Sequence, residues 1–342
     1  MYTSINQRIT QTPPLSPKGE DFSQQSHYQL RPLQSKKGQR KRGMFRCAVL
    51  VLTALILAGC GSAEQQYVRR AVKLMDKRGL FAEGPAWEAA RAEALAAKPA
   101  TQEEAYEVTR QALKVAGGKH SFISTVESQQ QAATEDKETA PSVTLREDGI
   151  LMIVLPAFSG QTKDENLRYA HTVLDALPEA GTPEAESLKG VVIDLRGNTG
   201  GNMYPMIAAV HRFLPDDYIL RFKSRKFTMP VTKEFVLRNV GIEAGTSITC
   251  PVALLTDDWT GSSGEATLLC FRGLENARTF GAPTAGYASA NSPFPMPDGS
   301  QLVLTISCDM ARTGEVFCDD PIDPDVVTDK PLEEAIGWIQ SL

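Results

Sequence analysis

The sequence predicts an α/β fold in which strands and helices alternate, preceded by a small bundle of helices. Two observations lead to this prediction. From Gly149 onward, apolar runs of strand length alternate with segments of helical periodicity, an order typical of an α/β core. Upstream of that point, residues 60–118 have helical patterns. No repeat of fixed period runs through the 342 residues, which argues against a solenoid or a propeller.

Residues 1–59 differ in composition from the rest and are expected to be a leader with a lipoprotein signal peptide. A basic run over residues 36–42 precedes an apolar run over residues 48–59. This apolar run is too short to span a bilayer but has the length of a signal-peptide core. It ends in the letters LAGC at Cys60, which resemble a bacterial lipobox. The alternative is a buried core segment that happens to precede a cysteine.

The lipobox predicts that Cys60 carries a lipid. The protein would then be exported and anchored to a bacterial membrane, on its periplasmic or extracellular face. Both Met1 and Met44 stand as candidate start residues.

Charge separates the leader from the rest of the chain. The leader has a net charge of +7, which leaves −12 for the chain from Cys60 onward. An acidic mature surface argues against nucleic acid as a partner and favours cationic ones.

Four cysteines remain after the leader and Cys60, and an oxidising compartment would allow three pairings among them. They are Cys250, Cys270, Cys308 and Cys318. We favour a Cys308–Cys318 bridge because the residues between these two have the pattern of a hairpin. No CxxC motif and no cysteine-histidine cluster has zinc spacing, so we expect no metal site.

The helical region covers residues 60–118, with helices expected over residues 66–77, 84–97 and 101–117. A loop that bears His120, followed by a mobile flap, is expected over residues 119–148, because residues 125–141 are polar. The core is expected over residues 149–342, with a cap inserted at about residues 218–249. Strands are predicted over residues 150–155, 190–195, 250–256 and 302–306, and helices over residues 165–177, 203–213 and 265–271.

Ser262 lies between a predicted strand and a predicted helix, in the letters DDWTGSSGE over residues 257–265. A serine at such a turn projects its hydroxyl from the element and has a backbone N–H beside it, which is what acyl transfer requires of a nucleophile. The alternative is that Ser262 or Ser263 only caps the helix.

A second turn follows the strand over residues 190–195 and contains Gly200 and Gly201. Glycines let backbone N–H groups approach a substrate carbonyl closely. The alternative is a plain strand-to-helix turn. The letters fit neither a Walker motif nor GxGxxG, so nucleotide binding has little support.

His120 is the candidate general base. It follows a glycine pair in a loop, and an imidazole titrates near neutral pH. His171 and His211 lie in predicted helices and are expected to be structural.

Four strings occur in the order and spacing of the C-terminal processing (tail-specific) serine peptidases. They are VVIDLRGNTGG, TGSSGE, FGAPTAG and PIDPD, over residues 191–201, 260–265, 280–286 and 321–325. The resemblance implies a ClpP/crotonase-like βαβ core. It also implies that Ser262 is the nucleophile, and that Ser263 and either Gly200 or Gly201 provide the oxyanion hole.

The chain departs from the family pattern in two ways. Tyr287 follows Gly286 where many members have a lysine base, which excludes a Ser-Lys dyad. The interval between His120 and Gly149 is too short for a PDZ domain. Both features resemble the branch that includes the nisin resistance protein and the tricorn core protease, where a histidine upstream of the core serves as the base. Three residues are candidates to orient His120, namely Asp319, Asp320 and Ser121.

We therefore predict a serine-type endopeptidase that cleaves peptides or proteins of the cell envelope by a Ser-His mechanism, without a cofactor or metal. The alternative is a catalytically inactive, peptide-binding lipoprotein with the same fold. An acyl-CoA enzyme on a crotonase-like core is disfavoured, because export separates the protein from CoA. The natural substrate and the oligomeric state are not specified by the sequence.

Overall fold

The computed structural model describes residues 61–135, 140–160, 162–179 and 181–342. The leader and the expected lipid site at Cys60 lie outside the described residues. Within the described part, no helix is both long enough and apolar enough to cross a bilayer.

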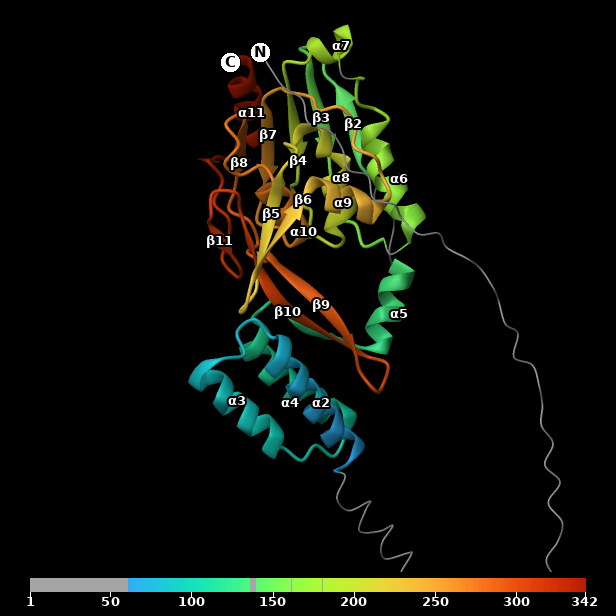
Figure 1. The fold of residues 1–342 in the computed structure, drawn as a ribbon, viewed down its shortest axis with the longest axis vertical. Helices are drawn as coiled ribbons and strands as arrows, with labels where there is room; N and C mark the ends of the chain where they lie inside the picture. The colour runs from blue at the N-terminus through green and yellow to red at the C-terminus, as the bar shows by residue number, and fades with distance from the viewer. Residues whose placement is uncertain (1–60, 136–139, 161, 180) are drawn as a thin grey trace, which may run out of the picture. The chain divides into compact units, whose positions relative to one another are not determined.

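The N-terminal region forms the three expected helices, which are α2 (Ala63–Arg78), α3 (Gly84–Ala96) and α4 (Gln102–Gly117). Thr101 begins α4, because its hydroxyl accepts a hydrogen bond from the Glu104 N–H at 3.2 Å. Tyr67 and Leu113 are buried between the helices and belong to one apolar cluster with Leu302 of the following sheet. Figure 1 shows the helices next to strands β9 and β10.

A central six-stranded sheet forms the core, in the order β12-β8-β7-β4-β3-β2. Its strands are β2 (Ser142–Leu145), β3 (Ile150–Val154), β4 (Gly190–Asp194), β7 (Val252–Thr256), β8 (Ala277–Gly281) and β12 (Val326–Val327). All neighbours are parallel except β2 and β3. Every residue of β4 and β7 is buried, as expected for strands covered on both faces.

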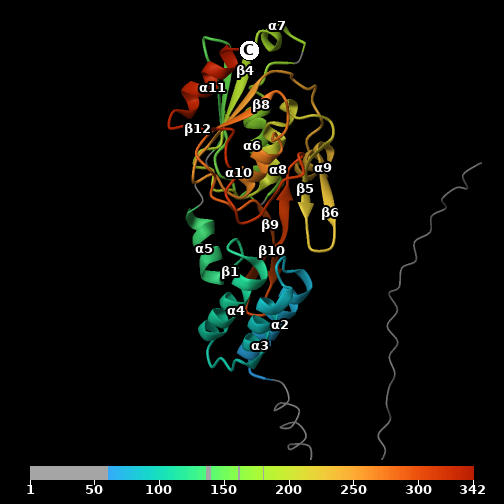
Figure 2. The same cartoon turned by 90° about the vertical axis from the view of Figure 1, so that its left-hand side faces the viewer.

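Helices cover both faces of this sheet, which confirms the predicted α/β class (Figure 2). On one face, α11 (Pro331–Gln340) packs Ala335 and Ile339 against Ile150, Val192 and Ala253. A larger cluster on the other face includes residues of α6 (Lys163–Leu174), α8 (Met203–Ala209) and α10 (Ser263–Leu269). Two short elements complete this part, α7 (Pro183–Glu186) and the 3-10 helix η1 (His211–Phe213).

A second sheet is built around the long strand β10 (Gln301–Met310). It also contains β1 (Phe122–Ser124), β5 (Tyr218–Lys223), β6 (Thr228–Thr232), β9 (Ser289–Pro295) and β11 (Val316–Phe317). One part of β10 pairs with β1 and β9, and its last residues pair with β5 and β11. The strand thereby connects the helical region to the core.

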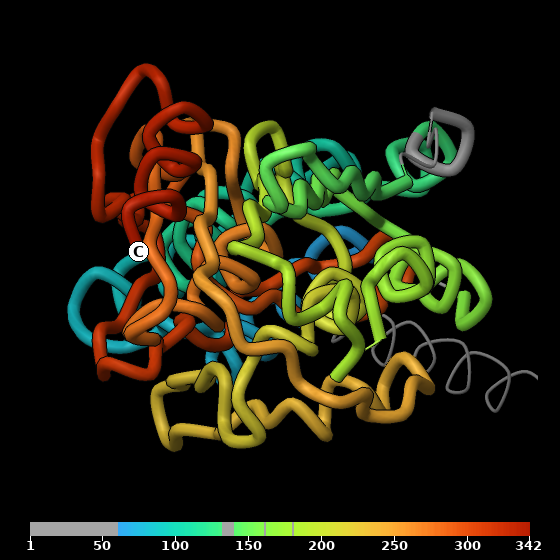
Figure 3. The backbone as a smooth tube through the Cα atoms, turned by 90° about the horizontal axis from the view of Figure 1, so that it is seen from above, coloured from blue at the N-terminus to red at the C-terminus, as the bar shows by residue number. Residues whose placement is uncertain are grey.

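The segment expected as an inserted cap is built into this second sheet. Strands β5 and β6 form a hairpin that pairs with β10, and α9 (Lys233–Val240) contacts α8. Figure 3 shows the gold β5–β6 hairpin and the red C-terminal helix on different sides of the core. Val231 and Val236 are buried, so burial of apolar side chains holds the segment to the core.

The polar stretch over residues 125–141, expected as a mobile loop, instead contains the helix α5 (Val126–Glu135). Thr125 accepts a hydrogen bond from the Ser128 N–H, and the Gln129 side chain donates to the Ser124 carbonyl. Residues 126–128 are exposed, so no apolar stripe in the sequence indicated this helix.

Candidate active site

Ser262 lies in a sharp turn between β7 and α10. Its φ is +51°, the only positive φ of a non-glycine residue in the described part of the chain. Such strained serines occur at nucleophile turns, where the hydroxyl is presented away from the backbone. Ser262 is also the N-cap residue of α10, and it stands in a capping-box arrangement with Glu265. The position at the start of α10 therefore fits both a cap and a nucleophile, and the nucleophile role stays a prediction.

The buried carboxylate of Glu265 holds this turn. It accepts hydrogen bonds from the backbone N–H groups of Ser262 at 2.8 Å, Gly286 at 2.9 Å and Tyr287 at 2.8 Å. A fourth bond comes from the Thr284 hydroxyl. Burial raises the pKa of Glu265, while these hydrogen bonds act in the opposite direction. The carboxylate thus joins the start of α10 to the segment that follows β8.

The two glycines of the second turn lie directly against Ser262 and Ser263. Gly200 has a φ of +106° and Gly201 a φ of +116°. A Cβ on Gly200 would lie 2.7 Å from the Cβ of Ser262 and 3.0 Å from the Ser263 nitrogen. A Cβ on Gly201 would collide with the Phe158 carbonyl. Only glycine fits this approach.

The N–H groups of this turn are not equivalent. Gly200 donates to the Asn198 side-chain oxygen at 2.9 Å, so its N–H is already satisfied. Among the described residues, no acceptor is recorded for the N–H groups of Gly201 and Ser263. The Ser263 hydroxyl donates to the Gly201 carbonyl at 2.7 Å and joins the two residues.

His120 lies in the loop between α4 and β1 and is held by β9. Its Nδ1 is hydrogen-bonded to the Ser289 hydroxyl at 2.9 Å, and its carbonyl accepts a bond from the Asn291 amide at 2.8 Å. The imidazole packs at an edge-to-face angle against Tyr287, with ring centroids 5.2 Å apart. These contacts fix the orientation of the ring. The bond to Ser289 uses Nδ1, so Nε2 is the ring nitrogen that this bond does not use.

Burial lowers the pKa of His120 to about 4. The Asp319 charge and the bond to Ser289 raise it, whereas the Lys119 charge lowers it further. The imidazole is therefore neutral at physiological pH, which is the protonation state that a general base requires.

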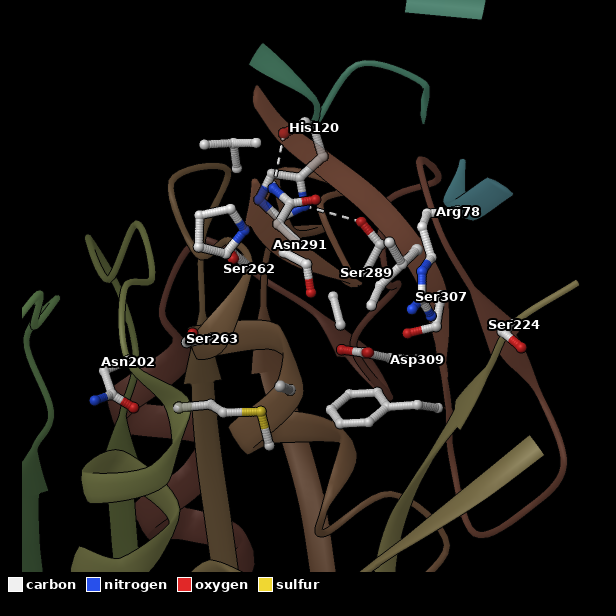
Figure 4. A pocket seen from close by; sticks show the side chains of 18 of the residues that line it. Arg78, His120, Asn202, Ser224, Ser262, Ser263, Ser289, Asn291, Ser307 and Asp309 are labelled. Carbon is white, nitrogen blue, oxygen red and sulfur yellow. Dashed lines mark hydrogen bonds between the residues drawn. The ribbon is translucent and has the colours of Figure 1, made fainter. Parts of the chain in front are cut away.

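One cavity of about 1150 Å³ is lined by both His120 and Ser262, although the two come from distant parts of the sequence. Ser263, Thr199 and Gly201 also line it. Figure 4 shows His120, Ser262 and Ser263 around this space. No hydrogen bond joins His120 to Ser262 in the described structure, so their catalytic contact stays a prediction.

None of the three residues expected to orient His120 is hydrogen-bonded to its imidazole in the described structure, although the Asp319 charge raises the pKa of His120 and the buried Oδ1 of Asp319 has no recorded partner. The Ser121 hydroxyl donates to the Gly117 carbonyl at 2.9 Å, and Asp319 accepts a bond from the Lys119 N–H at 3.2 Å. Asp320 is exposed and has no recorded bond to the imidazole. The side chain that is hydrogen-bonded to Nδ1 of His120 is that of Ser289. Ser289 was not predicted from the sequence, where its one available signal is a hydroxyl residue shortly after the FGAPTAG string.

The Cys308–Cys318 disulfide is present, whereas Cys250 and Cys270 are free and buried. Cys308 pairs with Ser289 across β9 and β10, and Cys318 precedes Asp319. The bridge thereby links two segments that contact the His120 loop.

The other two described histidines lie away from this cavity. His171 forms a pair with Asp175 at 3.0 Å, and His211 is bonded to the Ala208 carbonyl at 2.7 Å. In the part of the chain that the structure describes, no group of three or more histidine, cysteine or acidic side chains is placed to hold a metal ion.

Comparisons with known proteins agree with this geometry. Residues 149–328 match the model of peptidase family S41. The nisin-resistance protein of Lactococcus lactis subsp. lactis is 33% identical over 289 residues, which cover 81% of this chain and 87% of that protein. The carboxy-terminal processing protease CtpA of Bacillus subtilis (strain 168) is 25% identical over 200 residues, which cover 57% of this chain and 39% of CtpA.

A lipoprotein of known structure from Streptococcus agalactiae has a TM-score of 0.73 and 30% identity, and the match covers 82% of this chain and 98% of that one. Together these matches confirm the family resemblance inferred from the four sequence strings.

Proposed function

Because the chain belongs to peptidase family S41, we propose that it is an active serine-type endopeptidase with Ser262 as nucleophile and His120 as general base. One observation carries the proposal. Ser262 and the neutral imidazole of His120 line the same cavity. Peptides or proteins of the cell envelope are the proposed substrates.

The proposed reaction has two halves. The Ser262 hydroxyl attacks the substrate carbonyl and gives its proton to Nε2 of His120, which then protonates the leaving amine as the C–N bond breaks. Water next attacks the acyl-enzyme, loses a proton to His120, and releases a carboxylic acid while Ser262 regains its proton. Ser289 supports this tautomer by accepting a hydrogen bond from Nδ1–H, which leaves the lone pair on Nε2.

The oxyanion of each tetrahedral intermediate would be held by the N–H groups of Ser263 and Gly201. We assign Gly201 rather than Gly200, because Asn198 already accepts the Gly200 N–H. Two backbone donors preorganised in this way stabilise the charge that develops in the transition state.

A non-catalytic, peptide-binding protein is the second candidate. Two observations favour it, because no carboxylate is bonded to the imidazole and no hydrogen bond joins His120 to Ser262 among the described residues. This candidate predicts binding of peptides in the cavity without turnover.

We also propose that the mature protein is exported and lipid-anchored through Cys60. The support is the leader sequence and the similar structure described as a lipoprotein. Mass spectrometry of the protein from bacterial membranes would test this. A chain that begins at Cys60 and carries acyl chains is expected, whereas an unmodified Cys60 would contradict the proposal.

Cleavage of a peptide library, read by mass spectrometry, tests the activity itself. The wild-type protein should yield new termini at defined positions, and Ser262→Ala should yield none. Ser341→Ala, at an exposed serine that follows the C-terminal helix, is the matched control and should cleave as the wild type does. Specific peptide binding without any cleavage would establish the second candidate instead.

A further inference from the structure

Asp309 is a buried acid for which neither the family strings nor the proposed mechanism provides a role. It lies near the end of β10, its side chain is 2% exposed, and it lines the same cavity as Ser262. Figure 4 shows its carboxyl group facing this cavity, below Ser307.

The Asp309 carboxyl is not satisfied by the protein. Its Oδ1 is buried and has no hydrogen-bond partner among the described residues. Two other buried acids differ, because Glu265 accepts four hydrogen bonds and Asp194 is paired with Arg196 at 2.6 Å. Asp319 also has a buried oxygen without a partner, but its second oxygen accepts a hydrogen bond from the Lys119 N–H. Buried polar groups are nearly always paired, so an unpaired one that faces a cavity indicates that its partner enters from the cavity.

The surroundings of Asp309 favour a cation as that partner. Burial and the nearby charge of Glu265 raise the pKa of the Asp309 carboxyl well above its ordinary value. A cation that enters the cavity would stabilise the Asp309 carboxylate, whereas an anion would meet the acidic groups of Asp309 and Glu265. Phe222 lies opposite on β5, and it also lines the cavity together with Ala266. These apolar walls suit the aliphatic stem of a long basic side chain.

In the described structure, the basic residues that line the cavity are not paired with Asp309. Arg225 donates to the carbonyls of Ala82 at 2.6 Å and Asp76 at 2.9 Å, so it ties the hairpin to the helical region. Lys77, Arg78 and Lys226 are exposed, and no ion pair between them and Asp309 is recorded in the described structure. Exposed charges are screened by water and salt, whereas a buried carboxylate acts at close range.

From these observations we infer that Asp309 forms a specificity subsite that binds the ammonium or guanidinium group of a lysine or arginine side chain close to the cleaved bond. This inference rests on the proposed peptidase function, since the subsite and Ser262 share one cavity.

Cleavage kinetics of matched peptides test the subsite. Starting from a peptide that the enzyme cleaves, each residue flanking the cleaved bond is set in turn to Lys, Arg, Gln or norleucine, and kcat/KM is measured. At one position the wild type should prefer Lys or Arg over norleucine by about 100-fold or more, as expected for a site built to bond a polar group. Asp309→Asn should reduce that ratio at least tenfold. Asp164→Asn, an exposed acid on α6, should leave the ratio unchanged.

Arg78→Ala separates the subsite from an internal ion pair. If Arg78 were the true partner of Asp309, both substitutions would change the basic-to-neutral ratio alike, and the inference would be overturned. The subsite predicts that only Asp309→Asn lowers it.

The wild-type profile alone decides the matter if Asp309→Asn does not fold. Cleavage with no preference for a basic residue at any flanking position would reject the subsite and leave the peptidase function standing. A protein that cleaves no peptide and is not labelled by a serine-directed probe would reject the peptidase function first.

Discussion

The two halves of the proposed catalytic pair are held in different ways. Ser262 lies in a turn of the core, fixed by the buried carboxylate of Glu265 and by the close approach of Gly200. His120 lies in a loop between the helical region and the second sheet, and Ser289 and Asn291 of β9 hold it. The two residues that position the nucleophile, Glu265 and Gly200, therefore both lie within the strings that resemble the family. The base depends on the docking of separate segments, so substitutions in the two halves should have different consequences.

The largest effect should come from removing either partner. Ser262→Ala and His120→Ala should each lower kcat by roughly 10,000-fold or more, and the double variant should be no worse than either alone, because the two act as a unit. Steady-state kinetics on one cleaved peptide checks this. Multiplied losses in the double variant would show that the two side chains act independently.

Glu265→Gln tests the nucleophile half. The amide replaces one acceptor oxygen with a donor that faces backbone N–H groups, so buried donors are left unpaired. Each unpaired group costs about 1–3 kcal/mol, and the free energy of unfolding should fall accordingly. Urea denaturation measures this loss, which should be accompanied by loss of activity. A stable Glu265→Gln protein with normal turnover would mean that the turn does not need this carboxylate.

Ser289→Ala tests the base half and should separate activity from stability. Loss of the bond to Nδ1 should lower kcat by about 10- to 100-fold, because general-base catalysis depends on ring orientation and tautomer. The unfolding free energy should change by only about 1 kcal/mol, the net value of one hydrogen bond. Ser289→Thr, which keeps the hydroxyl, should restore much of the activity. A comparable fall in kcat for Ser289→Thr would point to packing rather than to the hydrogen bond.

The pH profile gives the smallest expected effect. Because the base must be neutral, kcat/KM should rise with pH through the pKa of His120, which is about 4, so activity should persist well below pH 6. The Lys119 charge lowers this pKa, so Lys119→Gln should move the acidic limb of the profile to higher pH. His171→Gln, at an exposed histidine, is the control and should not move it. An acidic limb that stays in place in Lys119→Gln would remove Lys119 as an influence on the base.

The difference between the Ser262 turn and the His120 loop also explains which parts of the site could be predicted from the sequence. Ser262, its glycine neighbours and the strands that precede them follow from local patterns, because buried parallel strands are apolar runs and turns require glycine. The helices of the N-terminal region have caps and apolar stripes and were equally predictable. Ser289 carries no comparable mark, since its contact with His120 arises only when β9 folds against the loop after α4.

Three further features could not be predicted from the sequence, for similar reasons. Helix α5 is polar, so its periodicity is invisible in the sequence. The strands β5 and β6 owe their position to pairing with β10, which is distant in sequence. The unpaired state of Asp309 is likewise a property of the folded cavity.

Labelling with a fluorophosphonate probe, read as intact mass and by peptide mapping, tests the central claim most directly. The wild type should gain one adduct on Ser262, His120→Ala should react far more slowly, and Ser262→Ala should not react. An adduct that forms on Ser262→Ala, or a wild-type protein that stays unlabelled under conditions that label an active serine peptidase, would contradict the account.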